Sequence, residues 1–506
     1  MPKIDMNKRK WENRHKTFND PIKNMYTLFN GAGDAVDTYN KVTSEIMALI
    51  KKATEDKTTL RALGAGWSWH QIMTGGPKGI ILDTKPLNTI FPISQARVLP
   101  SYTKEVNKLK FVQCGAGIWE LNEALKPINL SLKTTGASNG QTIAGLIGTG
   151  AHGSAIDIGS AQDFVVGLHI VVSSTRHVYI ERDSYQVVNQ SFVDKFGAEL
   201  IRNDEIFNAA LVSFGCFGFV HGVMVEVDDI FLIEGSMRMD DFDNDVLKLM
   251  QTNDFTNTGT VNVAEPNTRP YHFEVKLNPY DSLQQVYITT MYKKPFHTNY
   301  MPPNPNSEGI GPGDDAPAFI GKVLETVPSL IPKAINTLTK SSLTLYEKAT
   351  GSIGEIFNNT LLRGKLLSAA IAIPIDRIKE VIAVLAEVNA IPSVKNFPGI
   401  YAFRFVKGTK ATLGFTKFNQ TCVVEMDGAY SDRSIEYCKK VWDKLEEKNI
   451  PFACHWGKQT DLSPSRIQYM YGQAAVDSWK AARNSLLDAD SKKVFTNPIM
   501  EKWGLD

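Results

Sequence analysis

The chain is poor in cysteine, with five among 506 residues, at positions 114, 216, 422, 438 and 454. They are widely spaced and odd in number, and no CxxC pair or Cys/His cluster has the spacing of metal ligands. The sequence therefore predicts neither a disulfide scaffold nor a metal site. Such cysteine usage favours a reducing compartment, and we predict a cytoplasmic protein.

The chain also lacks an excess of charge of either sign. Its 55 Lys and Arg residues offset 54 Asp and Glu residues, which leaves a formal net charge of +1. This balance argues against a general nucleic-acid-binding protein. No apolar run is long enough to span a bilayer, and the basic start of the chain lacks the apolar core of a signal peptide. We expect neither a nucleic-acid partner nor a membrane span.

Glycine, in contrast, is concentrated between residues 136 and 154, in GASNGQTIAGLIGTGAHGS. Six of these nineteen residues are Gly, and each interior Gly costs a helix about 1 kcal/mol relative to Ala, which argues against an ordinary helix. Ile143, Leu146 and Ile147 are too apolar for a flexible linker. The pattern indicates backbone NH groups held against a flat or anionic ligand. The simpler alternative is a tight turn between two core strands.

The rest of the pattern predicts an α+β architecture of two domains. Up to residue 230, strands and helices alternate around two glycine-rich turns, and a helix is predicted over residues 43–53 with Thr43 as its N-cap. Beyond residue 233, adjacent strands at 271–279 and 284–294 and an amphipathic helix at 375–390 predict a second sheet with covering helices.

Six motifs together resemble a known superfamily. They are RALGAGWSW, QTIAGLIGTGAHGS, FNAALVSFGCFGFV, HFEVKLNPY, CHWGK and FTNPI. The resemblance is to the vanillyl-alcohol-oxidase-like flavoproteins, which carry a PCMH-type FAD-binding domain. Within that superfamily the chain is most similar to sugar-1,4-lactone oxidases such as D-arabinono-1,4-lactone oxidase, alditol oxidases and one class of bacterial sterol oxidases. The match covers roughly residues 20–290 and 395–506.

The resemblance implies a PCMH-type FAD-binding domain over residues 1–232. A substrate domain with an antiparallel sheet covered by helices is expected over 233–455. A C-terminal segment, 456–506, is expected to return to the FAD domain. An apolar insertion at about 295–366, interrupted by Pro328 and Pro332, has no clear counterpart. It is interpreted as a lid, a patch that contacts a membrane or a partner, or a helical hairpin of the core.

The resemblance also implies FAD as the cofactor, because glycine-rich turns supply NH groups for a pyrophosphate. Residues 64–68 would wrap the pyrophosphate, residues 141–145 and 148–154 would line the ribityl chain and the ring, and residues 215–220 would lie near the adenine. His152 is interpreted as a structural hydrogen-bonding residue of this site. The predicted cofactor residues are Gly64, Ala65, Gly66, Trp67, Ser68, Gly136, Gln141, Thr142, Gly145, Gly148, Thr149, Gly150, His152, Gly153, Ser154, Gly215, Gly218 and Val220.

One departure from the family concerns the covalent flavin link. Many relatives attach FAD through a His in the first glycine turn, and this chain has Trp67 at that position. Indole cannot form that bond, and His70 lies three residues further on. We therefore predict non-covalent FAD with Trp67 packed near the ring, and we interpret Trp69 as a core aromatic residue.

A second departure concerns the catalytic carboxylate. Relatives that oxidise alcohols carry a Glu-x-Arg pair on a substrate-domain strand and a Lys in HWGK. Arg404 matches the Arg, Ala402 stands at the Glu position, and Glu425 either replaces the carboxylate or is a buried partner of Arg404. Lys458 or Arg404 would stabilise the reduced flavin. Glu425 or His455 would accept the hydroxyl proton.

The implied function is an FAD-dependent oxidase or dehydrogenase that oxidises a CH–OH group of a small alcohol by hydride transfer to flavin N5. O2 or another acceptor would then reoxidise the flavin. Two alternatives stay open at this point. One is an oxidase of a bulky hydrophobic alcohol, either sterol-like or a biosynthetic intermediate. The other is a flavin-binding protein without turnover that serves an interaction.

Overall fold

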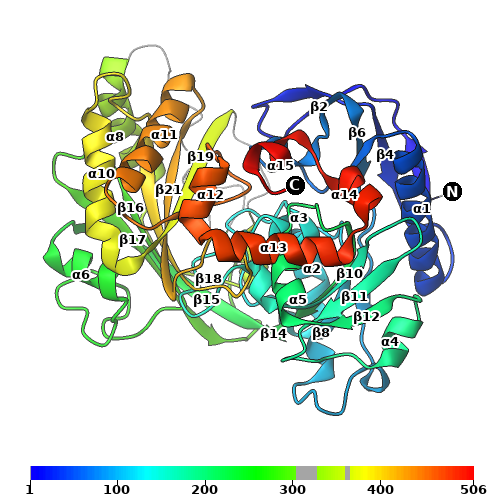
Figure 1. Cartoon of the computed structure of the whole chain (residues 1–506). Coiled ribbons are helices and arrows are strands. Elements are labelled where there is room, and N and C mark those ends of the chain that lie inside the picture. Colours follow the sequence, from blue (N-terminus) through cyan, green and yellow to red (C-terminus); the bar gives the residue numbers. More distant parts are fainter. Residues whose placement is uncertain (1, 304–327, 359–364) are drawn as a thin grey trace.

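The computed structural model describes residues 2–303, 328–358 and 365–506, which form two halves lying side by side (Figure 1). The first 230 residues build one half around two sheets. Most of the following residues build the other half around a single large sheet. Helices near the C-terminus, red in Figure 1, run from the second half back across the first.

The first half contains a four-stranded sheet of order β1-β4-β6-β5 and a six-stranded sheet of order β12-β11-β10-β13-β8-β7. The strands of the first sheet are β1 (Lys3–Asp5), β4 (Asn24–Leu28), β6 (Gly79–Asp83) and β5 (Thr59–Leu63). Those of the second are β12 (Glu199–Arg202), β11 (His177–Glu181), β10 (Val165–Val171), β13 (Phe219–Glu226), β8 (Leu109–Gln113) and β7 (Ile90–Pro92). Two short pairs accompany them, β2 (Lys10–Glu12) with β3 (Asn19–Pro21) and β9 (Leu130–Ser131) with β14 (Asp228–Asp229).

The helices of this half are α1 (Ala35–Glu55), α2 (Ile118–Leu125), α3 (Ile143–Gly148), α4 (Gln190–Asp194) and α5 (Asp204–Leu211). The predicted start of the first helix is wrong. Asp34 is the N-cap of α1, and its side chain accepts from the backbone NH groups of Val36 and Asp37. Thr43 lies inside the helix, where its hydroxyl donates to the Tyr39 carbonyl at 3.2 Å. The first two turns are mostly polar, so hydrophobic periodicity did not reveal them.

The glycine-rich stretch contains a short helix after all. In α3, Ile143, Leu146 and Ile147 are buried on one face. Burying three such side chains contributes about 2 kcal/mol each, which outweighs the cost of two helical glycines. The helix stops at Gly148, and Gly150 adopts a φ of +73° that favours glycine.

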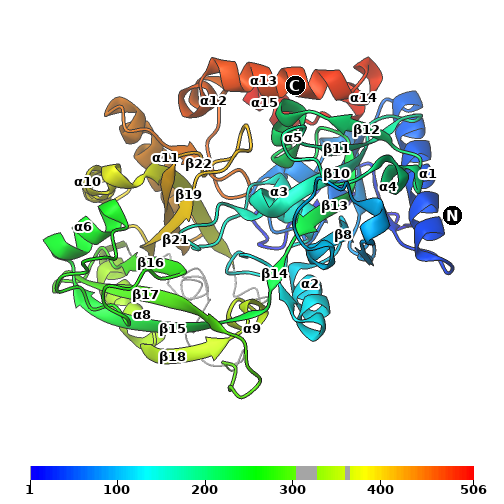
Figure 2. The same cartoon turned by 90° about the horizontal axis from the view of Figure 1, so that it is seen from below.

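The second half is an eight-stranded sheet in which every neighbouring pair is antiparallel, as predicted. In spatial order its strands are β18 (Tyr346–Gly351), β15 (Phe231–Asp241), β17 (Gln285–Pro295), β16 (His272–Leu277), β20 (Gly399–Lys407), β21 (Gln420–Ala429), β19 (Leu366–Pro374) and β22 (Ala453–Cys454). Helices α6 (Asn244–Thr252), α10 (Ile378–Ala390) and α11 (Asp432–Glu447) cover one face (Figure 2). The helix predicted at 375–390 is thereby confirmed.

The two faces of the large sheet differ in what they contact. Tyr401, Phe403 and Phe405 on β20 pack into the core beneath α10 and α11. Because side chains alternate along a strand, Ala402 and Arg404 occupy the opposite face. That face is turned toward the first half and carries the charged residues described below.

Only part of the predicted insertion falls within the described residues; positions 304–327 and 359–364 lie outside them. The described part includes α8 (Ile331–Ser342), whose Ile331 and Ile335 pack with Met237 and Tyr287 of the sheet. It also includes β18 and the short α9 (Ile353–Ile356). Pro332 stands in the first turn of α8, where a proline is tolerated, so it does not interrupt this helix.

Four helices close the chain: α12 (Pro464–Tyr471), α13 (Gln473–Leu486), α14 (Ala489–Phe495) and α15 (Pro498–Trp503). Helix α13 packs on α5, and α14 packs on α1 and β5. The indole of Trp479 donates to the Val212 carbonyl at 3.1 Å, and Arg483 donates to the Cys216 carbonyl at 3.0 Å. Within the described ranges, no helix has the length and apolar character needed to cross a bilayer.

Candidate active site

A cavity of about 240 Å³ lies where the two halves meet. The three glycine motifs of the first half form one wall, and β19, β20, β21 and residues 455–458 supply the other. All four predicted catalytic residues and fifteen of the eighteen predicted cofactor residues line it. Gly150, Gly153 and Ser154 lie outside the lining. A Cβ on Gly153 would come within 2.5 Å of the Thr135 carbonyl oxygen, so this glycine permits close backbone packing behind the wall.

The lining suits a ligand that offers both hydrogen bonds and a flat apolar surface. Among the described residues, six buried polar atoms of the lining have no hydrogen-bond partner: His15 Nδ1, Trp67 Nε1, Gln141 Oε1, Thr142 Oγ1, Ser368 Oγ and Glu425 Oε2. Buried polar groups are normally paired, so these six indicate contacts that a ligand would complete. A Cβ built on Gly148 would meet no atom within 4 Å and would project into open space. These features fit FAD.

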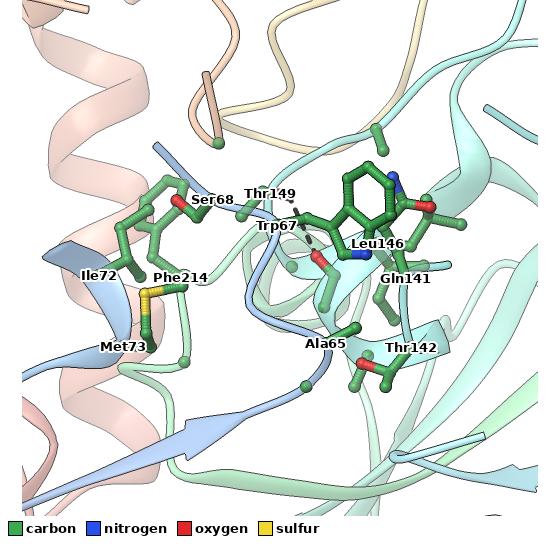
Figure 3. Close-up of a pocket in the computed structure, with 18 of the residues that line it drawn as sticks. Ala65, Trp67, Ser68, Ile72, Met73, Gln141, Thr142, Leu146, Thr149 and Phe214 are labelled. Atoms are coloured by element: carbon green, nitrogen blue, oxygen red, sulfur yellow. Dashed lines mark hydrogen bonds between the residues drawn. The ribbon is translucent and has the colours of Figure 1, made fainter. Parts of the chain in front are cut away.

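Trp67 is one of the residues that line the cavity (Figure 3), and two neighbours restrict its indole. The Arg14 guanidinium lies 4.6 Å from the centre of its ring. On another side, a Cβ on Gly140 would come within 2.6 Å of the indole. The position occupied by a flavin-linking His in relatives is thus filled by an aromatic side chain for which the neighbouring loop leaves room.

Trp69 is more than a core residue, because it also lines the cavity. Its indole NH donates to the Leu366 carbonyl at 2.9 Å, and His15 stacks on it with ring centres 3.7 Å apart. His70, in contrast, lies outside the lining, and its Nε2 is 2.5 Å from the Thr460 hydroxyl.

A row of buried charges begins at the far wall, with Lys458, Glu425 and Arg404, and continues behind it. Glu425 contacts Lys458 Nζ at 2.5 Å and Arg404 Nε at 3.3 Å. The same Arg404 Nε is 2.9 Å from Glu274, whose other carboxylate oxygen is 2.5 Å from Lys276 Nζ. Cations and carboxylates therefore alternate through five side chains, with one more cation than anion. Glu425 is a buried partner of Arg404 and also lines the cavity; its role as the catalytic carboxylate stays a prediction.

The strand register places Glu425 beside Ala402, the position of the missing glutamate. Ala402 is paired with Glu425 on β21 and with Lys276 on β16. Directly opposed residues share one face of a sheet. The small Ala402 leaves space above β20, and Glu425 extends over it from the neighbouring strand to reach Arg404.

The cations keep both carboxylates ionised. Burial alone would raise the pKa of Glu425, but Arg404 and Lys458 outweigh it and hold the pKa well below its usual range. For Glu274, burial is likewise outweighed by Lys276 and Arg404, which lower the pKa to about 2. Neither carboxylate is a strong proton acceptor at neutral pH.

Two imidazoles lie near Glu425, His152 from the glycine-rich wall and His455 from the opposite one, and backbone contacts fix their tautomers. His152 Nδ1 is 2.9 Å from the Gly153 carbonyl oxygen, which can only accept, so Nδ1 carries the proton. His455 Nδ1 accepts from the Gly457 NH at 2.9 Å, so its proton is on Nε2. Burial lowers the pKa of His152 to about 4 and that of His455 well below its usual value. Both rings are therefore neutral at neutral pH.

Glu274, Lys276 and Arg61 are site residues that the sequence interpretation did not assign. The first two stand in HFEVKLNPY, where alternating charges inside an otherwise apolar strand were the available signal. Arg61 lines the cavity and is fully buried without a carboxylate partner in the described chain. It donates to the carbonyls of Ile72, Phe495, Gly215 and Phe214 at 2.8, 2.8, 3.1 and 2.5 Å.

This fold and this cavity define a flavoprotein of the vanillyl-alcohol-oxidase type with a PCMH-type FAD-binding domain. Residues 39–179 match the family model described as FAD binding domain, and residues 243–503 match that of D-arabinono-1,4-lactone oxidase. The second match covers more than half of the chain, which therefore belongs to the D-arabinono-1,4-lactone oxidase family.

Relatives agree with this placement. The chain is 28% identical over 209 residues to D-arabinono-1,4-lactone oxidase of Candida albicans, covering 39% of this chain and 33% of that protein. It is 25% identical over 167 residues to the mitochondrial L-galactono-1,4-lactone dehydrogenase of Brassica oleracea, covering 32% and 26%. The aligned part thus spans about a third or less of these relatives.

Solved structures share the whole fold. The cholesterol oxidase of B. sterolicum superposes with a TM-score of 0.67 at 15% identity, covering 99% of this chain and 97% of that one. A VAO-type flavoprotein from Myceliophthora thermophila superposes with a TM-score of 0.59 at 11% identity, covering 93% and 78%. At such low identity the likeness concerns the fold alone.

Proposed function

We propose that this protein is an FAD-dependent oxidoreductase that oxidises a CH–OH group of an aldono-1,4-lactone to a carbonyl. The observation that carries the proposal is the Arg404–Glu425–Lys458 cluster on the cavity wall, within the region that matches the lactone oxidase family. O2 or another acceptor would take the electrons. The cluster also argues against a flavin-binding protein without turnover, because five buried charges are costly to keep beside a cavity that does no chemistry.

The chain's own residues would hold the cofactor as follows. The turn at 64–68, the loop at 136–149 and the turn at 215–220 would surround FAD, with Gln141 and Thr142 supplying side-chain hydrogen bonds. When bound, FAD supplies the hydride acceptor. Lys458 and Arg404 give this end of the cavity a positive potential, which favours a reduced, anionic ring and a substrate oxygen with developing negative charge.

We further propose that FAD is bound without a covalent link. Trp67 stands at the linking position, and His70 is directed at Thr460 outside the lining. Acid precipitation of the yellow protein tests this: free FAD in the supernatant is expected. Flavin that stays in the pellet would contradict the proposal and would point to His15, an imidazole that does line the cavity.

The substrate class is tested by anaerobic bleaching of the flavin absorbance. We expect D-arabinono-1,4-lactone or L-galactono-1,4-lactone to bleach the wild-type flavin. Glu425→Gln, which removes the charge between Lys458 and Arg404, is expected to retain FAD and to bleach at least a hundredfold more slowly. Bleaching by cholesterol but by neither lactone would show that the substrate is a bulky hydrophobic alcohol and not a sugar lactone.

A further inference from the structure

The cavity wall contains two hydrogen-bond acceptors that face each other without a donor between them. His152 Nε2 lies 3.6 Å from Glu425 Oε1. Because Nδ1 of His152 carries the ring proton, Nε2 presents a lone pair, and Glu425 presents a carboxylate oxygen. No hydrogen bond to Nε2 occurs from any residue that the structure describes. Two acceptors in this arrangement indicate a ligand that brings a donor.

The other groups around Glu425 are occupied by charges or by the backbone. Glu425 Oε1 lies 2.5 Å from Lys458 Nζ, and Oε2, which accepts no hydrogen bond among the described residues, lies 3.3 Å from Arg404 Nε. The acceptor nitrogen of His455 is used by the Gly457 NH, so its other nitrogen can only donate. Lys458 and Arg404 are themselves cations. Among the described groups that contact Glu425, His152 is the one whose nitrogen lone pair these contacts leave available.

We propose that His152 is the catalytic residue that accepts the hydroxyl proton of the substrate, a role that rests on the proposed lactone oxidation. The substrate O–H bond breaks, and its proton passes to Nε2. FAD, the oxidant of the proposed function, would take the hydrogen of the adjacent C–H bond with its electron pair as the C=O bond forms. Glu425, ionised at 3.6 Å, stabilises the imidazolium that results. Lys458 and Arg404 would stabilise the negative charge on the substrate oxygen.

This assignment changes the roles expected from the sequence. His152 was expected to be structural, and Glu425 or His455 to be the base. In the proposed arrangement His152 is both a structural residue and the base, since Nδ1 donates to the Gly153 carbonyl and Nε2 faces the substrate. Glu425 becomes a positioning residue for the imidazole and the cations.

The test is His152→Asn, in which the amide NH2 can still donate to Gly153 while the Nε2 lone pair is lost. We expect the variant to bind FAD, measured by flavin fluorescence, and to reduce it with lactone at least a hundredfold more slowly than the wild type. The control is His70→Asn, which removes an imidazole that is also buried but lies outside the lining. This control is expected to stay within about threefold of the wild type. Reduction of His152→Asn at the control's rate would overturn the assignment.

A binding measurement adds a readout that does not depend on turnover. Calorimetric titration of the dithionite-reduced holoenzyme compares the lactone with an analogue that lacks the hydroxyl at the oxidised carbon. The wild type is expected to prefer the lactone by tenfold or more, and His152→Asn to lose most of that preference. An unchanged preference would contradict contact between His152 and this hydroxyl.

Two further outcomes are distinguishable. If no aldono-lactone bleaches the wild-type flavin, the proposed function fails, and the role of His152 fails with it. If His152→Asn does not retain FAD, stopped-flow pH jumps on the wild type decide. His152, facing Glu425, Lys458, Arg404 and His455, predicts a fall in flavin reduction below about pH 4. A rate that stays level to pH 3 would assign the proton to Glu425 instead.

Discussion

Two glycines of the glycine-rich stretch 136–154 differ in what an added methyl group would meet. At Gly140 a Cβ would approach the Trp67 indole to 2.6 Å, whereas at Gly148 it would meet no atom within 4 Å. Gly140 is therefore needed for the packing of Trp67, and Gly148 keeps space free inside the cavity.

We expect Gly140→Ala to destabilise the apoprotein by about 1–3 kcal/mol, since the indole must shift out of a packed position. The free energy of urea unfolding measures this. Gly148→Ala is the matched control and is expected to unfold at the same urea concentration or a higher one, because Ala favours helix. In the same control FAD is expected to bind at least tenfold more weakly, as judged by fluorescence titration. Equal effects of both variants on stability would show that contact with Trp67 does not matter.

At the scale of elements, three neighbouring strands hold the charges: β16 carries Glu274 and Lys276, β20 carries Arg404, and β21 carries Glu425. Removing one member of such a buried network leaves the remaining charges uncompensated, which costs more than the pair itself contributes. The network thus makes the stability of the sheet depend on pH.

The pKa of Glu274, lowered to about 2 in the folded protein, lies below that of the unfolded chain. Its contribution to stability is therefore present above about pH 4.5 and is lost as the pH falls toward 2. It amounts to about 3 kcal/mol as an order of magnitude. Glu274→Gln is expected to be less stable at pH 7 and to lose less stability between pH 5 and 3, as measured by urea unfolding at each pH.

The matched control for this prediction is Glu347→Gln. Glu347 pairs with Arg238 at 2.7 Å on the same sheet, but it is half exposed. A screened surface pair contributes little, so we expect a change of less than about 1 kcal/mol at any pH. If Glu274→Gln and Glu347→Gln had the same pH dependence, the buried network would not be the source of the effect.

Sequence patterns predicted those elements of the second half that local periodicity determines. The strands β16 and β17 and helix α10 follow from alternation or amphipathic spacing. The polar start of α1 and the helix inside the glycine stretch did not follow, because one depends on a cap and the other on tertiary burial. The domain limits at 232 and 455 stay predictions.

The candidate site was only partly predictable for a related reason. Motif resemblance identified residues 64–68, 141–145, 148–154, 404 and 458, most of which the structure gathers around one cavity. Ala402 opposite Glu425 depends on strand register, and the lone pair of His152 depends on which backbone groups its ring meets. Neither the strand register nor the contacts of the ring can be read from local spacing. The sequence could therefore name Glu425 and His455 as candidate bases but could not assign roles to them and to His152.

At the scale of the whole molecule, Arg61 joins segments that are far apart in the sequence. Its guanidinium donates to the carbonyls of Ile72, of Phe214 beside the glycine turn at 215–220, and of Phe495 at the end of α14. We expect Arg61→Met to lower stability by about 3 kcal/mol or more and to weaken FAD binding, because several buried carbonyls lose a charged donor. Thermal unfolding and FAD titration measure this. Arg433→Met removes one exposed contact, to the Lys395 carbonyl, and is expected to change neither quantity appreciably.

The contacts that Arg61 makes with distant segments bear on when the protein acquires its cofactor. The Phe495 carbonyl accepts from Arg61, and the Asn497 side chain donates to the Ile72 carbonyl at 2.9 Å. On a ribosome, residues 495–497 are made more than four hundred positions after the turn they complete, and they leave the exit tunnel later still. The nascent chain can form both sheets of the first half before these contacts to Arg61 and Ile72 exist. Tight capture of FAD is therefore expected only after residues 495–497 have been made and their helices have docked on the first half.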